Sequence, residues 1–282
     1  KLMVAVHMIT YNHESYIARA IDSVLGQKTN FRFKLFVGED SSTDRTREIC
    51  RNRASLNEDR IQLILHSENI GATRNSLAVL NACIESGARY IAQCEGDDFW
   101  CDPLKLQKQI SLLMERNDIS LCFHRSFVNK KDSLRIIGPV IENNDNVYST
   151  KDLLRFGGGL IPTASVVYRS EDVHSFYLAI SESKTAGDYV QALYLSTVGS
   201  LYCLGDVMSV YTNDNLQSLT NKSRSILGEI AYKKYVMNLL TEFDKFTDRK
   251  FSFLVLNKKI KLLIGLLYRL TWVRIRKAKL LR

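Results

Sequence analysis

The chain lacks several features that would assign it quickly to a class of protein. It has only three prolines and no low-complexity stretch, so we expect no long flexible linker. Its longest apolar run, residues 262–268, is far shorter than the roughly 20 residues that cross a bilayer. No charged-then-apolar leader precedes the strand-like run of residues 2–6. We therefore expect neither a signal peptide nor a membrane-spanning helix.

The cysteines are too widely spaced for two common uses. No Cys-x-x-Cys pair occurs, whereas a zinc site or a small disulfide scaffold needs closer spacing. This pattern favours free thiols in a reducing cytosol. The cysteines are Cys50, Cys83, Cys94, Cys101, Cys122 and Cys203.

Two phosphate-binding motifs are also missing. No Gly-x-Gly-x-x-Gly follows the first expected strand, and no Gly-x-x-x-x-Gly-Lys-Ser/Thr occurs anywhere in the chain. The sequence therefore offers neither a dinucleotide fingerprint nor a P-loop. We expect any bound phosphate to depend on a bridging metal ion.

Acidic residues are missing from one segment. Residues 250–282 hold ten Lys or Arg and no acid, whereas residues 1–249 hold 29 basic and 30 acidic residues. The net charge of +9 thus comes from the C-terminal segment, and the rest of the chain is nearly neutral. This distribution argues against a basic nucleic-acid groove, and no nucleic-acid partner is expected.

What is present is an alternation of strand-like and helix-like segments in the first hundred residues. At 45% hydrophobic residues the chain can bury a large core. The alternation has βαβ spacing and predicts an α/β fold with a mostly parallel central sheet flanked by helices. The expected strands are residues 2–10, 33–38, 61–65 and 90–94, and the expected helices are residues 14–27, 45–53 and a segment that follows residue 72.

Polar or acidic loops follow each of these four strands. Because strand carboxyl ends bind ligands in open α/β sheets, we expect the loops to share one cleft. Asp97 and Asp98 suit a metal site, Asp40 suits the imide N–H of a uracil, and Arg74 suits a phosphate or base. A solvated acidic turn, a turn-capping Asp and a surface Arg are the plainer alternatives. The loops contain Thr10, Tyr11 and Asn12, then Glu39 and Asp40, then Asn69, Gly71 and Arg74, then Asp97 and Asp98.

These blocks, in this order and spacing, resemble the inverting GT-A glycosyltransferases of family two, of the bacterial surface-polysaccharide kind. The similarity covers roughly the first 110 residues and extends faintly to about residue 220. Its blocks are residues 9–13 (Ile-Thr-Tyr-Asn-His), 39–44 (Glu-Asp-Ser-Ser-Thr-Asp), 69–72 (Asn-Ile-Gly-Ala) with Arg74 and Asn75, and 95–100 (Glu-Gly-Asp-Asp-Phe-Trp) followed by 102–106 (Asp-Pro-Leu-Lys-Leu).

The resemblance implies a nucleotide-diphosphosugar donor, with UDP preferred, held at the strand ends. It places Thr10, Tyr11 and Asp40 around the nucleoside. Asp97 and Asp98 stand where the family has its DxD-type motif, which contacts the ribose and a divalent metal, and we choose Asp98 as the metal ligand. Mg²⁺ or Mn²⁺ would neutralise the diphosphate as it leaves.

The resemblance also identifies a catalytic base in the second half of the chain. Asp188 opens an expected helix, where a capping Asp is the plainer alternative and where the family has its base. A Gly157–Gly159 run precedes it and suits either close backbone approach to an acceptor or a flexible turn. The chain departs from the family after Tyr211, because relatives commonly have an Arg and a His there and this chain has residues 212–215 (Thr-Asn-Asp-Asn).

The C-terminal segment predicts a surface-binding helix. Residues 252–281 mix apolar residues with Lys and Arg, and a basic amphipathic helix that contains a Trp suits an anionic bilayer. Docking on the rest of the chain or on a second subunit, in a homodimer, is the alternative. The predicted domains are residues 1–222, with a donor half (1–110) and an acceptor half (111–222), and a helical extension, residues 223–282.

The sequence thus predicts a metal-dependent enzyme that moves a hexose from a UDP-sugar to a hydroxyl of a glycan. The expected acceptor is lipid-linked, of capsule or O-antigen type, at the inner face of the cell membrane. A non-catalytic nucleotide-sugar-binding or scaffold subunit is the alternative, and a nucleotidyltransferase fits less well because the first loop is not glycine-rich. The sugar, the acceptor and the linkage are not specified by the sequence.

Overall fold

The computed structural model describes residues 2–130, 133–140, 146–173, 177, 188–212 and 225–280, with backbone only at 130, 133, 188, 270 and 272–280. Two compact units make up the chain, Lys1–Asn215 and Leu216–Arg282. The predicted boundary between residues 222 and 223 lies outside the described residues and stays a prediction.

Strands and helices alternate through the first hundred residues, as the sequence predicted. The apolar face of the first helix shows why, since Ile17, Ala20, Ile21 and Val24 recur at helical spacing and are all fully buried. These elements are β1 (Val4–Thr10), α1 (Ile17–Leu25), β2 (Phe33–Glu39), α2 (Thr46–Ser55), β3 (Ile61–Leu65), α3 (Ala72–Glu85) and β4 (Tyr90–Gln93).

The second half of this unit adds longer and less regular connections. Its elements are β5 (Phe99–Trp100), α4 (Lys105–Glu115), β6 (Ile119–Lys130), β7 (Ser133–Ile137), β8 (Val147–Tyr148), α5 (Thr150–Phe156), β9 (Val167–Arg169), α7 (Asp188–Val198) and β10 (Ser200–Thr212).

One sheet joins all ten described strands. Its main order is β3-β2-β1-β4-β9-β6-β10-β5, with β7 on β6 and β8 on β10. The first four strands pair in parallel: Val4 lies opposite Phe33 of β2 and opposite Tyr90 of β4. Their carboxyl ends therefore lie along one edge of the sheet. The predicted fold class, a mostly parallel α/β sheet flanked by helices, is confirmed.

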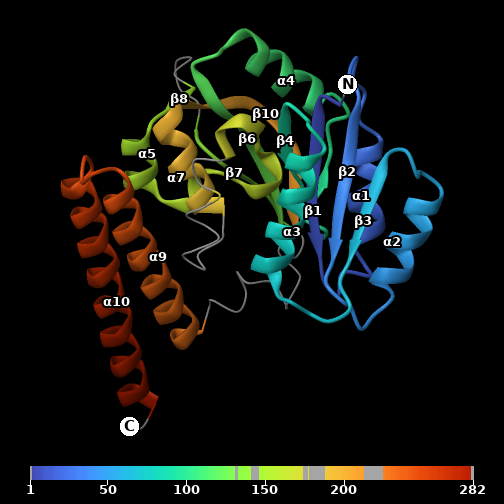
Figure 1. Ribbon diagram of the computed structural model, residues 1–282. Coiled ribbons are helices and arrows are strands. Elements are labelled where there is room, and N and C mark those ends of the chain that lie inside the picture. Colours follow the sequence, from blue (N-terminus) through green and yellow to red (C-terminus); the bar gives the residue numbers. More distant parts are fainter. Residues whose placement is uncertain are drawn as a thin grey trace. The chain divides into compact units, whose positions relative to one another are not determined.

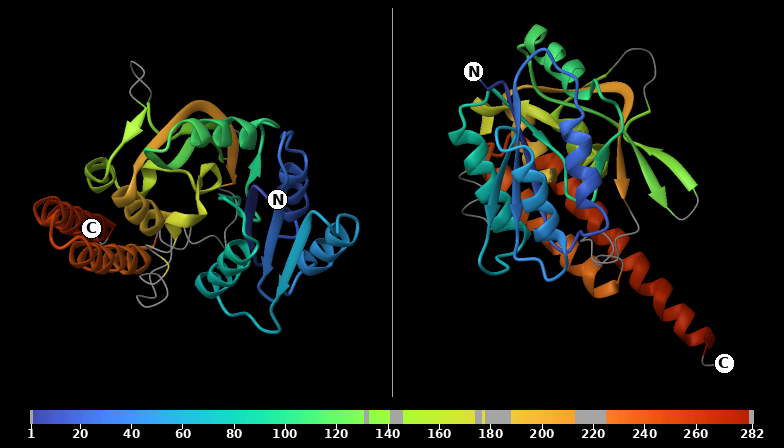
Figure 2. Two further views of the ribbon diagram at one scale, coloured as in Figure 1. Left: turned by 45° about the horizontal axis from the view of Figure 1, so that its top comes forward. Right: turned by 90° about the vertical axis from the view of Figure 1, so that its right-hand side faces the viewer.

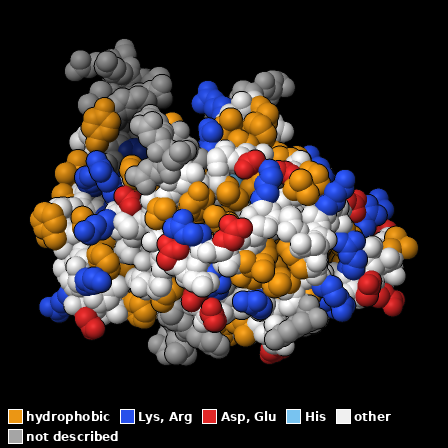
Figure 3. Space-filling view, turned by 90° about the horizontal axis from the view of Figure 1, so that it is seen from above, with side chains coloured by type: hydrophobic (Ala, Val, Ile, Leu, Met, Phe, Trp, Pro, Cys, Tyr) orange, Lys and Arg blue, Asp and Glu red, His pale blue; other side chains and the backbone are white. Residues whose placement is uncertain are grey.

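Helices cover both faces of the parallel strands. Figures 1 and 2 show α3 on one face of β1–β3 and the pair α1 and α2 on the other. The main core lies beneath α1 and α4, where fully buried side chains of β1, β2 and β4 meet those of the helices. On the face shown in Figure 3, basic and acidic side chains are interspersed with apolar ones, as a nearly neutral body requires.

The second unit is a helical hairpin. Its helices, α9 (Ile226–Phe246) and α10 (Ser252–Leu280), run antiparallel and side by side (Figure 1). Ser225 caps α9 by accepting the amide of Gly228 at 3.0 Å. No helix among the described residues is long and apolar enough to cross a membrane.

Four short strands were not predicted from the sequence. These are β5, β7, β8 and β9, each of two to five residues. β7 pairs antiparallel with the end of β6, so these two strands form a hairpin.

Candidate active site

Hydrogen bonds of Asn12 join the loop after β1 to the loop after β2. Asn12 has a positive φ of 54°, its amide donates to Ser42 Oγ at 3.0 Å, and its Oδ1 accepts the amide of Thr43 at 2.9 Å. Thr10 is buried, whereas Tyr11 is 37% exposed. Of the three predicted binding residues in this loop, Tyr11 thus presents a ring to solvent and Asn12 fixes the loop.

The first carboxylate after β2 serves the fold. Glu39 is fully buried, its Oε1 accepts the amide of Ser42 at 2.7 Å, and its Oε2 forms an ion pair with Arg47 of α2. Because both oxygens are used in this way, Glu39 holds the loop against α2. Its predicted contact with the donor stays a prediction.

The second carboxylate joins this loop to the one after β3. Asp40 is 2% exposed, and its two oxygens accept the amides of Ile70 at 2.8 Å and Gly71 at 2.9 Å. Gly71 has a φ of 86°, which favours glycine, and directly precedes α3. Asn69 and Arg74, on either side, are exposed. Asp40 therefore orders the loop that presents Asn69 and Arg74 at the sheet edge.

The acidic turn after β4 packs directly against the end of β1. The amide of Gly96 donates to the carbonyl of Ile9 at 3.0 Å. A Cβ at position 96 would lie 2.7 Å from Thr10 Oγ1 and 3.0 Å from His13 Nδ1, so the turn requires glycine here. Asp97 Oδ2 lies 3.7 Å from His13 Nε2. The structure thus brings the first and fourth strand ends together, as predicted.

His13 is close to a carboxylate but is held in its neutral form. Burial lowers the pKa of His13, although the charges of Asp97 and Asp44 oppose that shift. Thr10 Oγ1 lies 3.2 Å from its Nδ1. The sequence placed His13 in the donor loop but gave no sign of its contact with Asp97, because that contact depends on the pairing of β1 with β4.

Asp98 is the more enclosed of the paired acids. It is 1% exposed, and its Oδ1 accepts the amide of Thr212 at 2.9 Å. Thr212 is the last residue of β10, so this bond joins the acidic turn to a strand 114 residues later. Sequence reasoning missed Thr212, because a backbone amide leaves no signal in the side-chain pattern.

The described residues do not assemble a complete metal centre by themselves. No group of three or more His, Cys, Asp or Glu side chains in the described part of the chain is close enough to hold an ion. Asp97 and Asp98 are adjacent hard oxygen ligands, and Mg²⁺ is commonly held by one or two carboxylates together with substrate phosphates. The donor set therefore fits a divalent cation that shares its coordination with a diphosphate.

The predicted base is the first residue of α7, but the side chain of Asp188 lies outside the described residues. The start of this helix is firmly placed by its neighbour Tyr189, whose hydroxyl donates to the carbonyl of Leu153 at 3.2 Å. A Cβ on Gly158 would lie 3.0 Å from the Cβ of Tyr189. The triple glycine thus allows close packing against the helix that carries Asp188. Residues 213–224, which include Asp214 and Asn215, are also outside the described part.

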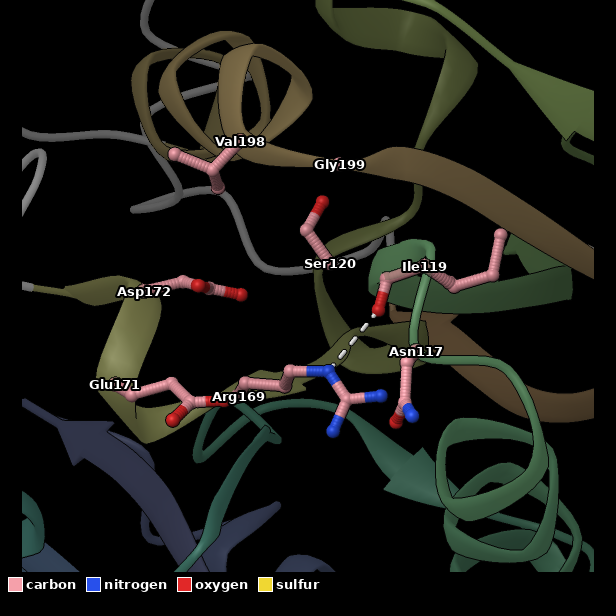
Figure 4. Close-up of a pocket in the computed structure, with 8 residues that line it drawn as sticks. All are labelled: Asn117, Ile119, Ser120, Arg169, Glu171, Asp172, Val198 and Gly199. Carbon is pink, nitrogen blue, oxygen red and sulfur yellow. Dashed lines mark hydrogen bonds between the residues drawn. The ribbon is translucent and has the colours of Figure 1, made fainter.

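A separate cavity of about 180 Å³ lies in the same unit at the opposite edge of the sheet (Figure 4). It is lined where β6 and β10 begin, by residues that include Ile119 and Gly199. Arg169 Nε donates to the carbonyl of Ile119 at 3.2 Å. Burial, and then the charge of Glu171, raise the pKa of Asp172 at its rim. Because it lies at the amino ends of these strands, this cavity is not the predicted donor site.

Comparison with known proteins agrees with this geometry. The family described as Glycosyl transferase family 2 matches residues 5–172. An uncharacterised protein of Mycobacterium bovis is 33% identical over 205 residues, which are 72% of this chain and 56% of that protein. An uncharacterised glycosyltransferase of Haemophilus influenzae is 32% identical over 116 residues, or 41% of this chain and 34% of that one. The chain thus spans about half the length of the mycobacterial relative.

Two solved structures share the fold at low sequence identity. Staphylococcus aureus TarS 1-349 in complex with UDP-GlcNAc has a TM-score of 0.62 at 15% identity, over 89% of this chain and 73% of that one. The mannosyltransferase PcManGT of Pyrobaculum calidifontis, in complex with GDP-Man and Mn²⁺, has a TM-score of 0.58 at 14% identity, over 98% and 79%.

Proposed function

Because the chain belongs to glycosyl transferase family 2, we propose that it transfers a hexose from a UDP-sugar to a hydroxyl of a glycan, with inversion at the anomeric carbon. The observation that carries this proposal is the convergence of the strand ends. Gly96 lies against Thr10, Asn12 bonds to Ser42, and Asp40 accepts the amides of Ile70 and Gly71, so four loops form one edge. The UDP-GlcNAc complex of TarS supports UDP as the nucleotide.

We assign the donor to this edge. The nucleoside is assigned to Thr10, Tyr11, Asn12, Glu39 and Asp40. A phosphate or base is assigned to Gly71 and to the exposed Asn69 and Arg74. Arg74 is in the first turn of α3, and a guanidinium offers paired donors to a phosphate. The binding role of each residue rests on its place at the strand ends.

Asp97 and Asp98 would hold a divalent cation, Mn²⁺ or Mg²⁺, with Asp98 as the proposed direct ligand. When bound, such an ion stabilises the charge that develops on the departing diphosphate. The Mn²⁺ complex of PcManGT supports this assignment. Asp97 follows Gly96 in the turn that packs against the end of β1, which keeps its carboxylate at the same sheet edge.

Asp188 is the proposed base. As the acceptor oxygen attacks the anomeric carbon, Asp188 takes the hydroxyl proton, the new glycosidic bond forms, and the bond from the sugar to the diphosphate breaks to release UDP. The position supports the role because Asp188 is the first residue of α7, where the backbone is fixed by Tyr189 and Gly158.

We further propose a lipid-linked glycan acceptor of the capsule or O-antigen type, and peripheral association with the inner face of the cell membrane. The ten basic residues and no acid in residues 250–282 support this location, because anionic headgroups attract such a segment.

One alternative is a protein with the same fold that does not catalyse transfer. A subunit that binds nucleotide-sugar without transfer stays open, because residues 212–215 read Thr-Asn-Asp-Asn where relatives commonly have an Arg and a His. A nucleotidyltransferase is disfavoured by the lack of a glycine-rich loop after β1.

The decisive experiment compares catalysis with binding. We expect wild-type protein to hydrolyse one of a panel of UDP-sugars in the presence of Mn²⁺, and UDP with Mn²⁺ to raise its melting temperature. Asp188→Asn should abolish turnover and retain the thermal shift, whereas the matched control Asp172→Asn, in the cavity at the opposite edge, should retain both. Thermal stabilisation without turnover of any UDP- or GDP-sugar would favour the binding subunit.

A further inference from the structure

The outward face of α10 carries an unusual density of exposed apolar side chains. Counting from Phe253, they recur at steps of three, four and seven residues, which places them on one side of a helix. Their exposed fractions range from 43% for Ile260 to 75% for Phe253. We call this set the α10 stripe: Phe253, Leu256, Ile260, Leu263, Ile264, Leu267 and Tyr268.

The opposite face of α10 is the one used inside the hairpin. Val255 is 2% exposed, and Lys259 Nζ donates to Thr241 Oγ1 of α9 at 2.7 Å. Ser252 Oγ donates to the carboxylate of Asp244 at 2.9 Å. Packing against α9 (Figure 1) therefore buries this face and leaves the α10 stripe outside the hairpin contact.

Exposed cations border the stripe. Lys261 is exposed and, at 100° per residue, lies beside the stripe rather than opposite it. Lys250 is exposed in the turn that precedes α10. Glu229 of α9 is bound by Lys233 and Arg269. The stripe is thus an apolar surface bordered by exposed ammonium groups, which matches a surface that is apolar inside and anionic outside.

We propose that α10 lies flat in the headgroup region of an anionic membrane, with the α10 stripe buried among the acyl chains and Lys250 and Lys261 on lipid phosphates. The stripe spans 16 residues, or about 24 Å of helix, which suits contact along the membrane plane. This inference rests on the membrane location in the proposed function and adds the surface, its orientation and its lipid class.

Flotation of the full chain with lipid vesicles tests the proposal. We expect recovery with phosphatidylcholine vesicles that contain phosphatidylglycerol, and much less with phosphatidylcholine alone. Ile260→Glu with Leu267→Glu should abolish flotation. The control is Leu56→Glu, an exposed apolar residue of the first unit, and it should float like the wild type.

The charge arm of the test uses Lys250→Gln with Lys261→Gln. Each cation near an anionic surface adds about fivefold to binding, so the double variant should bind roughly twentyfold more weakly to anionic vesicles. Binding to neutral vesicles should not change.

Two results would overturn the proposal. The first is wild-type protein that does not float with anionic vesicles. The second is light scattering that shows a dimer dissolved by Ile260→Glu with Leu267→Glu, because the stripe would then be a subunit interface. UDP-sugar hydrolysis in solution is measured on the same preparations and does not depend on flotation. Hydrolysis without flotation would overturn the membrane proposal alone, and flotation without hydrolysis would overturn the transferase proposal alone.

Discussion

Lys105 offers a sharp test of the structure, because a buried lysine is rare. It is the first residue of α4 and is completely buried, and its Nζ has no hydrogen-bond partner among the described residues. The nitrogen lies 4.0 Å from the centre of the Trp100 ring. The facing polar groups are the thiols of Cys94, directly after β4, and Cys122 on β6, and the neutral imidazole of His124. None of them is an anion at neutral pH that could compensate the ammonium charge.

Burial lowers the pKa of Lys105 to about 7, while the two thiols act weakly in the opposite direction. The unfolded chain has an ordinary lysine with a pKa near 10.5. Between these values the unfolded state holds a proton that the folded state has lost, so the free energy of unfolding rises with pH by ~1.4 kcal/mol per unit. The contribution of neutral Lys105 to the free energy of unfolding is fully present above pH 10.5. This contribution is lost progressively as the pH falls to about 7.

Replacing Lys105 by Met keeps the length of the side chain and removes the charge. We expect Lys105→Met to be more stable than the wild type at pH 7 by a few kcal/mol, and this difference to shrink by roughly 2 to 3 kcal/mol between pH 7 and 9. Urea unfolding at pH 7, 8 and 9, followed by circular dichroism, measures both quantities.

The matched control is Lys108→Met on the same helix. Lys108 is partly exposed and forms ion pairs with Asp102 and Asp206, which raise its pKa. Its removal should slightly destabilise the protein, with no gain at pH 7. A Lys105→Met protein that is less stable than the wild type at pH 7, or that keeps the steep rise with pH, would refute the argument.

Three further outcomes follow from the candidate site. Asp40→Asn replaces one of two accepting oxygens by an amide donor that faces a backbone N–H of Ile70 or Gly71, so it should destabilise the fold by about 1–3 kcal/mol and weaken UDP binding in calorimetry. Gly96→Ala should weaken UDP binding in calorimetry while changing the melting temperature little, because the new Cβ would displace Thr10 at the sheet edge. Removal of divalent ions with EDTA should stop UDP-sugar hydrolysis, and Mn²⁺ should restore it; full activity in EDTA would contradict the role given to Asp98.

The parallel half of the sheet could be predicted because its signal is local. Each of the strands β1 to β3 is followed directly by a helix, and the apolar run of β1 and the helical spacing of apolar residues in α1 are both local signals. The strands β5 and β9 have no such signal, because they consist of two and three residues. They form only where a neighbouring strand offers free backbone groups. β10 does this for β5, where Ser209 lies opposite Trp100.

The same distinction applies to the candidate site. Asp97 and Asp98 could be proposed from the sequence because acids at a strand end are conspicuous. Lys105 was not, since it precedes Leu106 at the border of the apolar face of α4 and looks like an ordinary flanking cation. Its burial depends on the packing of α4 against β6, where Gln109 Nε2 donates to the carbonyl of Cys122 at 3.1 Å.

The charge balance of the sheet edge explains why we expect the reaction to need a metal ion. Among the described basic groups near the strand ends, Arg47 is bound to Glu39, Arg74 is exposed, and burial lowers the pKa of His13. The carboxylates of Asp97 and Asp98 carry the same sign of charge as a diphosphate. Like charges repel one another unless a cation lies between them. A divalent ion that enters with the donor resolves this repulsion, which is why donor affinity itself, and not only turnover, should depend on the metal.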